Sequence, residues 1–150
     1  MSEMRELYQE MILDHHRHPR NSGKLPGANR SAEGFNPLCG DRVTVYALVE
    51  GDRIQDISFE GSGCAICIAS CSLMTEALRG RTVAEAEALF GRFHDLLTND
   101  AAVLDEAAMG KLAVFEGVRE FPVRVKCATL PWHAFRAAMQ QTVNQSVSTE

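Results

Sequence analysis

The sequence predicts an α+β domain in which a small antiparallel sheet of about three strands packs against helices. Residues 42–50 alternate apolar and polar side chains with the two-residue period of a strand. A Gly51-Asp52 turn and a second alternating stretch follow directly, which favours an antiparallel hairpin. Most of the remaining chain has the periodicity of helices, and 150 residues is the length of about one domain.

The N-terminal part of the chain predicts a helix, a loop and a short strand, in that order. Residues 3–16 place their apolar side chains mostly on one helical face, and Pro19 ends this helix. Residues 21–29 are rich in Gly, Pro, Asn and Ser, which is typical of a loop. Residues 30–35 then form a short strand.

The central hairpin is the clearest strand signal in the chain. Val43, Val45 and Ala47 share one face of the strand at 42–50, while the residues between them share the other. The return strand covers 54–60 and ends at two nearby glycines.

Two helices follow the hairpin. Residues 64–79 are apolar nearly all round at first, which predicts a buried helix that ends at Gly80. Thr82 and Glu85 have the spacing of a capping box, and the helix they begin runs to about Leu97.

The C-terminal third is expected to be mainly helical. It predicts short helices at 99–108 and 111–119, an extended stretch at 123–126 and a final amphipathic helix at 128–145. The tail, 146–150, is expected to be frayed. No internal repeat and no linker is visible, so residues 1–150 are taken as a single domain.

Charge and hydropathy exclude several classes of function. The net charge of −5 argues against non-specific nucleic-acid binding, which requires a basic face. No stretch approaches the roughly 18 apolar residues of a membrane span, and residues 1–10 have no apolar signal-peptide core. We therefore expect a cytoplasmic protein with no nucleic-acid or membrane partner, whose thiols stay reduced and serve as metal ligands or reactive groups.

Five cysteines lie in three separated segments, and together they suit a zinc or iron site. Cys39 is followed by Gly40 and Asp41, so a thiol and a carboxylate can reach one point across a tight turn. Cys64 follows a Gly-Ser-Gly loop at a helix start, where the helix dipole favours the thiolate. Cys127 follows a lysine, and a neighbouring cation also favours the thiolate.

The remaining candidate residues favour structural interpretations. Cys67 and Cys71 share a helical face with Cys64, so a Cys64–Cys67 redox or metal pair is possible, but we favour two small hydrophobic residues that fill the core. His15 belongs to a histidine cluster at the end of the first helix, where helix capping and surface exposure are favoured over metal binding. His94 and His133 are expected on helices as surface or hydrogen-bonded residues.

Taken together, the motifs resemble those of the U-type iron–sulfur assembly proteins, and within that family the SufU branch. The matching stretches occur in the family's order and span nearly the whole chain: Leu7-Tyr8, Asp14-His15, Pro19-Arg20-Asn21-Ser22-Gly23, Asn36-Pro37-Leu38-Cys39-Gly40-Asp41, Phe59-Glu60-Gly61-Ser62-Gly63-Cys64-Ala65-Ile66, Ala69-Ser70-Cys71-Ser72-Leu73-Met74-Thr75-Glu76 and Arg124-Val125-Lys126-Cys127-Ala128. Lys126 stands where the scaffold branch, IscU, has histidine. The helical stretch near 80–107 fits the insertion of the SufU branch.

The resemblance implies a SufE/NifU-like fold and a zinc site formed by Cys39, Asp41, Cys64 and Cys127. It also implies that Cys39 accepts persulfide sulfur from a SufS-type cysteine desulfurase and supplies the downstream iron–sulfur assembly machinery. The family usually has Ser or another small residue at positions 67 and 71, so the extra thiols of this chain are a departure.

Two other functions are compatible with the same residues. The thiols could hold a [2Fe–2S] cluster, which would make the protein an assembly scaffold. Alternatively, zinc could only stabilise an interaction module, in which case the thiols never accept sulfur and removal of zinc unfolds the domain.

Overall fold

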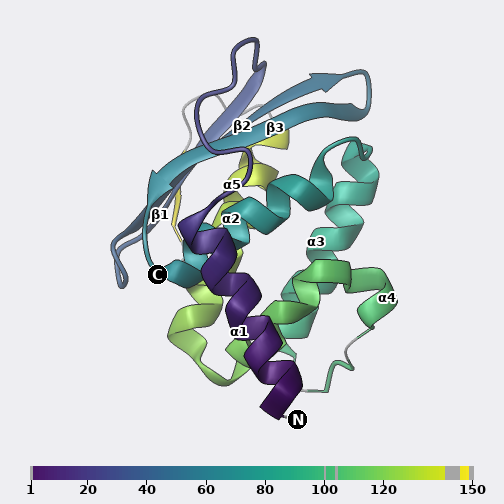
Figure 1. Ribbon diagram of the computed structural model, residues 1–150. Coiled ribbons are helices and arrows are strands. Elements are labelled where there is room, and N and C mark those ends of the chain that lie inside the picture. The colour runs from purple at the N-terminus through teal and green to yellow at the C-terminus, as the bar shows by residue number, and fades with distance from the viewer. Residues whose placement is uncertain (1, 100, 104, 141–145, 149–150) are drawn as a thin grey trace.

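The computed structural model describes residues 2–99, 101–103, 105–140 and 146–148. A four-stranded sheet in the order β3-β2-β1-β4 lies on one side of the molecule, and the helices lie on the other (Figure 1). The strands are β1 (Arg30–Asn36), β2 (Asp41–Glu50), β3 (Arg53–Ser62) and β4 (Ser146–Ser148).

The three antiparallel strands are confirmed, because β1 pairs with β2 and β2 with β3 in antiparallel register. The expectation of a frayed tail is wrong for residues 146–148, which pair in parallel with β1 as β4. A segment of three residues is too short to show the alternation that predicts a strand. Residues 146–148 form one because the free edge of β1 supplies their hydrogen-bonding partners.

The predicted buried face of β2 is also confirmed. Val43, Val45 and Ala47 are fully buried, whereas the residues between them are less buried. This face packs against α5, and β3 packs against α2. The buried face of β2 therefore lies at the boundary between the sheet and the helical layer.

The helical layer contains α1 (Ser2–Arg17), α2 (Ala65–Leu78), α3 (Val83–Thr98), α4 (Glu106–Met109), the 3-10 helix η1 (Gly110–Glu120) and α5 (Pro122–Met139). The buried character of α2 and the capping box of α3 are confirmed; Thr82 Oγ1 accepts from the Glu85 amide at 3.1 Å, and Glu85 Oε1 accepts from the Thr82 amide at 2.9 Å. Among the described residues, no helix is long and apolar enough to cross a membrane.

Two C-terminal predictions are wrong. Residues 123–126 are helical rather than extended, because Pro122 occupies the first position of α5, where its fixed φ suits a helix and its missing N–H costs nothing. In the described part of 99–108 only the residues from Glu106 onwards are helical, after Asp105 caps α4. The final helix ends at Met139, and residues 141–145 lie outside the described residues.

The segment predicted to be a helical insertion near 80–107 consists of α3, a connection and the start of α4. Its helical character is confirmed for α3. That this segment is an insertion relative to related proteins stays a prediction.

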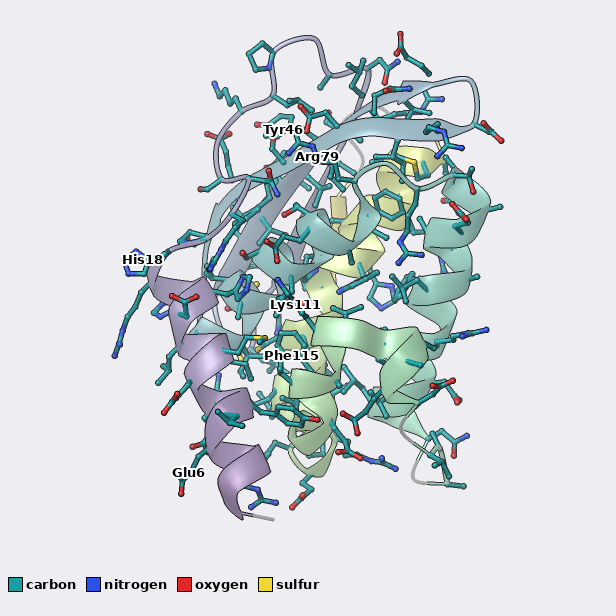
Figure 2. The ribbon with its side chains drawn as sticks, turned by 45° about the vertical axis from the view of Figure 1, so that its right-hand side comes forward. Glu6, His18, Tyr46, Arg79, Lys111 and Phe115 are labelled. Carbon is teal, nitrogen blue, oxygen red and sulfur yellow. The ribbon has the colours of Figure 1, made fainter. Side chains whose placement is uncertain are left out.

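The expectation that His15 lies at the surface is wrong. His18 points away from the helices (Figure 2), but His15 is only 3% exposed between α1 and α2. His15 Nδ1 and Ser72 Oγ form a hydrogen bond at 2.6 Å, and the Arg20 amide donates to the same oxygen at 2.9 Å. Helix-end chemistry suggested a capping role, but the packing of α1 on α2 buries this histidine.

Burial of His15 predicts a loss of stability in mild acid. Burial lowers the pKa of His15, and Arg20 and Lys111 lower it further, whereas Glu76 and Asp14 oppose this effect. The unfolded chain therefore binds a proton that the folded chain resists, and the free energy of unfolding falls as the pH drops below about 6.5.

We expect His15→Gln to reduce this pH dependence and the exposed-site control His16→Gln to leave it unchanged. Urea unfolding of metal-free protein at about pH 7.5 and about pH 5.5 measures the effect without interference from metal loss. Burial lowers the pKa of His133 too, so some slope should persist in His15→Gln. Equal slopes in parent and His15→Gln would contradict the assignment.

Candidate metal centre

Two segments that are far apart in the sequence, the β1–β2 turn with the start of β2 and the helix α5, meet at one end of β2. Cys39 lies in the turn between β1 and β2, Asp41 is the first residue of β2, and Cys127 lies in the second turn of α5. One donor atom from each of these three residues lies within 4.8 Å of the others. Gly40 has φ +71°, a left-handed conformation that glycine adopts without strain, so the predicted tight turn is confirmed.

Cys64 joins this group through its backbone and its sulfur. It is the N-cap of α2, and its amide donates to Asp41 Oδ1 at 2.9 Å. Its sulfur interacts with the Cys127 thiol but does not belong to the group in which donor atoms of Cys39, Asp41 and Cys127 lie within 4.8 Å of one another. Of the four predicted ligands, the structure therefore brings three together and places the fourth beside them.

The group has a buried side and an open side. Asp41 and Cys127 are fully buried, whereas Cys39 and Cys64 are partly exposed. The neighbour of Cys39 in the turn, Leu38, is 61% exposed. A reagent or partner could therefore approach Cys39 while Asp41 and Cys127 stay shielded from water.

Hydrogen bonding gives the thiols of Cys64 and Cys127 different pKa values. A bond from the Cys127 thiol, helped by the amides of Cys67 and Ile66 at the start of α2, lowers the pKa of Cys64 to about 6 despite its burial. The same bond and burial raise the pKa of Cys127. Cys127 Sγ also lies 3.2 Å from Cys39 Sγ, so the three thiols form one connected group.

The donor set fits a zinc ion. Zinc prefers thiolates in a tetrahedral arrangement, in which two sulfurs lie about 3.8 Å apart. The spacing of the three grouped donors is compatible with that geometry, and the partly exposed Cys64, whose amide contacts Asp41, is the neighbouring thiol that can supply a fourth ligand. The buried carboxylate also needs compensation by donors or a cation, which a metal supplies.

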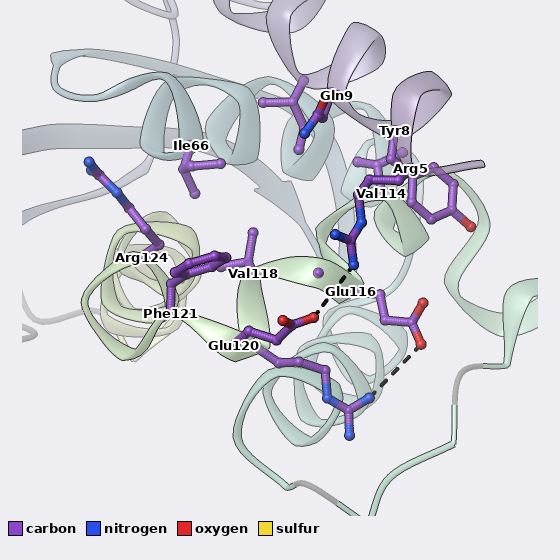
Figure 3. A pocket seen from close by; sticks show the side chains of 13 residues that line it. Arg5, Tyr8, Gln9, Ile66, Val114, Glu116, Val118, Glu120, Phe121 and Arg124 are labelled. Carbon is purple, nitrogen blue, oxygen red and sulfur yellow. Dashed lines mark ion pairs between the residues drawn. The ribbon is translucent and has the colours of Figure 1, made fainter. Parts of the chain in front are cut away.

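Arg124 provides positive charge at this site. The negative charge of Cys64 and a hydrogen bond with Cys127 raise the pKa of Arg124. Arg124 also lies at one end of a groove of about 790 Å³, where Figure 3 shows it near Ile66 and the 59%-exposed Phe121. Two ion pairs also line this groove: Arg5 with Glu120, and Arg119 with Glu116.

Cys67 and Cys71 lie inside α2 and are fully buried, which confirms their interpretation as core residues. A hydrogen bond with Cys71, together with burial, raises the pKa of Cys67. A thiol in this state is a poor nucleophile and a poor ligand.

Asn36 is a site residue that the sequence pattern did not single out. It is the last residue of β1, lies opposite Asp41 in the register and is fully buried. Its Nδ2 lies 3.5 Å from Asp41 Oδ2 and 3.6 Å from Cys127 Sγ. The Asn-Pro pair before Cys39 was the available signal, because it is typical of a turn in which the Asn side chain bonds the backbone.

Comparison with known proteins shows close similarity over nearly the whole chain. A family model described as the NifU-like N-terminal domain matches residues 7–128. The zinc-dependent sulfurtransferase SufU of Bacillus subtilis is 38% identical over 128 residues, which cover 85% of this chain and 86% of that protein. The iron–sulfur cluster assembly scaffold protein IscU of Streptococcus pyogenes is 33% identical over 150 residues, 100% of this chain and 93% of that one.

Solved structures agree with these matches. The crystal structure of FiSufU from Fervidobacterium islandicum AW-1, described as an iron–sulfur cluster assembly scaffold protein for the SUF system, has a TM-score of 0.82 and 37% identity, covering 89% of this chain and 97% of that one. The N-terminal part of a NifU-like protein from Brucella abortus has a TM-score of 0.82 at 26% identity, covering 91% and 94% of the two chains.

The approach of Gly63 to Asp41 predicts that even a methyl group will disturb the centre. A Cβ at Gly63 would lie 2.5 Å from Asp41 Oδ1, the oxygen that accepts from Cys64. We expect Gly63→Ala to displace the carboxylate and weaken zinc binding by about tenfold or more, as measured by competition with a chromophoric chelator.

The matched control is Gly91→Ala in α3, where a Cβ meets no atom within 4 Å. This change should leave zinc affinity unaltered and stabilise the fold by about 0.5–1 kcal/mol. Parent-like zinc affinity in Gly63→Ala would show that Asp41 does not contribute to metal binding from this position.

Proposed function

The chain belongs to the family of NifU-like N-terminal domains, and from this premise we propose that it is a zinc-dependent sulfurtransferase of iron–sulfur cluster assembly. In this proposal it accepts persulfide sulfur from a SufS-type cysteine desulfurase in a reducing compartment, the cytoplasm, and passes it to the downstream assembly machinery. The match confirms the family resemblance noted in the sequence, and the α+β fold agrees with that of the solved relatives.

One observation carries the proposal: a partly exposed thiol, Cys39, lies within 4.8 Å of two buried donors, Asp41 and Cys127. Such a site can hold a metal from its buried side and still present one thiol to a partner. The exposed Leu38 and Phe121 offer apolar surface on which a partner protein can pack.

We assign the metal to Cys39, Asp41, Cys64 and Cys127. When bound there, zinc would hold the thiols as thiolates at neutral pH without introducing redox chemistry. Arg124 offsets part of the negative charge of the thiols. Asp41 is the hardest ligand of the set, and the Cys64 amide holds it in place. It is therefore suited to tuning the affinity of the site for the metal.

Sulfur transfer would follow thiol–disulfide exchange. The Cys39 thiolate attacks the terminal sulfur of the desulfurase persulfide, so that a new S–S bond forms on Cys39 as the S–S bond of the donor breaks. The desulfurase cysteine leaves as a thiolate and is then protonated. The transfer has no net redox change, since one persulfide replaces another. The buried Cys127 and Asp41 keep the remainder of the site in place while Cys39 is engaged.

The relatives include a zinc-dependent sulfurtransferase and cluster scaffolds, so a [2Fe–2S] scaffold is the second candidate. Lys126 in place of the histidine of the scaffold branch favours the sulfurtransferase. A cluster that reconstitutes stably, with visible absorbance and without zinc, would favour the scaffold instead.

The deciding experiment measures cysteine turnover by a SufS-type desulfurase with zinc-loaded and zinc-stripped protein. We expect strong stimulation by the zinc-loaded form alone, because only that form holds Cys39 as a positioned thiolate. Stimulation by neither form would refute sulfur transfer. If zinc removal also unfolds the chain, as followed by circular dichroism, the interaction-module alternative would be supported.

Replacing Cys39 tests its role as acceptor. We expect Cys39→Ala to retain some zinc on the other three ligands but to lose at least about 99% of persulfide acceptance, because Cys127 is enclosed and Cys64 would stay bound to the metal. Mass spectrometry detects the added sulfur after reaction with the desulfurase.

The matched control is Cys71→Ala, which removes a fully buried thiol outside the metal centre. It should accept sulfur at the parent rate. Persulfide formation in Cys39→Ala at the parent rate would show that another residue is the acceptor.

A further inference from the structure

We propose that Asn36 is the positioning residue of the metal centre: its side-chain amide orients Asp41 and Cys127 and closes the turn that carries Cys39. This inference rests on the metal site of the proposed function and adds a residue to it. Asn36 need not touch the metal or the transferred sulfur, because its effect would pass through the groups it contacts.

The hydrogen-bonding pattern determines which way the Asn36 amide faces. The backbone amide of Leu38 donates to Asn36 Oδ1 at 3.2 Å, and a backbone N–H can only be met by an acceptor. The oxygen of the side chain must therefore face the turn. The NH2 group is then directed at Asp41 and Cys127, both of which accept hydrogen bonds when ionised.

Each hydrogen of this NH2 group has one acceptor. The 3.6 Å contact to Cys127 Sγ is of ordinary length, because sulfur is larger than oxygen. The 3.5 Å contact to Asp41 Oδ2 is long for N–H···O, so it acts mainly by attraction between the amide dipole and the carboxylate charge. Asp41 Oδ1 is held independently by the Cys64 amide at 2.9 Å, and together the two donors set the plane of the carboxylate.

Burial increases the energetic cost of losing either of these contacts. Asn36, Asp41 and Cys127 are all 0% exposed, so water cannot replace a lost donor. A bound metal is sensitive to such partners, and their loss typically weakens binding by about 10–100-fold. An N–H bond to sulfur also withdraws electron density from the thiolate, which changes the energy of its electronic transitions with a metal.

The variant that tests the donor role of Asn36 most directly is Asn36→Asp. It keeps an oxygen to accept from Leu38, so the turn can persist, but it replaces the donor NH2 with a second oxygen that faces Asp41 and Cys127. We expect zinc to bind about 10–100-fold more weakly by chelator competition. With Co²⁺ in place of zinc, the sulfur-to-cobalt charge-transfer band should move to longer wavelength, a change that general loss of stability would not cause.

Asn29→Asp is the matched control. Asn29 makes the same kind of two-point contact at the other end of β2, where Nδ2 donates to the Val49 carbonyl at 2.8 Å and Oδ1 accepts from the Val49 amide at 2.9 Å. It should lower the melting temperature and leave zinc affinity and the cobalt spectrum unchanged. Parent-like affinity and spectrum in a folded Asn36→Asp protein would overturn the proposal.

If Asn36→Asp does not fold, a measurement on the parent protein tests the hydrogen bond from the Asn36 side chain to the ligating sulfur. With ¹¹³Cd bound, a hydrogen bond to a ligating sulfur transmits scalar coupling from the metal to the donor proton. We expect this coupling on the Asn36 side-chain NH2 group. Its absence, together with side-chain shifts that do not respond to metal loading, would overturn the proposal.

The outcomes separate this inference from the proposed function. If the parent itself shows no thiolate–cobalt band, the metal site and with it the proposed function fail, whatever Asn36 does. If the parent binds metal and Asn36→Asp behaves like the parent, only the role of Asn36 fails.

Discussion

The arrangement of the metal centre depends on one buried carboxylate. Asp41 begins β2 with no exposure to solvent, and a carboxylate in that position needs hydrogen-bond donors or a cation. The donors come from two other segments, the Asn36 side chain at the end of β1 and the Cys64 amide at the start of α2. Satisfying this one group therefore holds the β1–β2 turn, the β3–α2 junction and their cysteines together.

The packing of α5 completes the site. The helix begins at Pro122, so Cys127 lies within its second turn and points into the interior beside Asp41. The same helix packs against β1 and β2. Any shift of α5 against the sheet would move the Cys127 sulfur relative to Asp41, which couples the geometry of the centre to the main core of the molecule.

The five thiols differ in burial, and this difference suits them to different roles. Cys127 is enclosed, Cys39 and Cys64 are partly open, and Cys67 and Cys71 are enclosed within α2. In such a site the buried ligands hold the metal and the partly exposed thiol contacts the partner. One ligand can then be exchanged without loss of the metal. The same division explains how one chain can contain five free cysteines and still confine the accessible thiols to one end of β2.

The sequence alone was sufficient for the β2–β3 hairpin, buried α2, the capping box of α3 and the candidate ligands, because local periodicity, turn chemistry and residue type carry that information. It did not predict the helical start of α5, the strand β4, the burial of His15 or the part played by Asn36. The helical start of α5 follows from the local effect of Pro122 at its first position, which the prediction from sequence missed. The other three depend on partners distant in the chain: β1 for β4, Ser72 for His15, and Cys127 for Asn36. Residue identity thus determined which groups could bind a metal, whereas only the tertiary structure decided which of them meet, because donors from separate segments converge only when the sheet and helices pack.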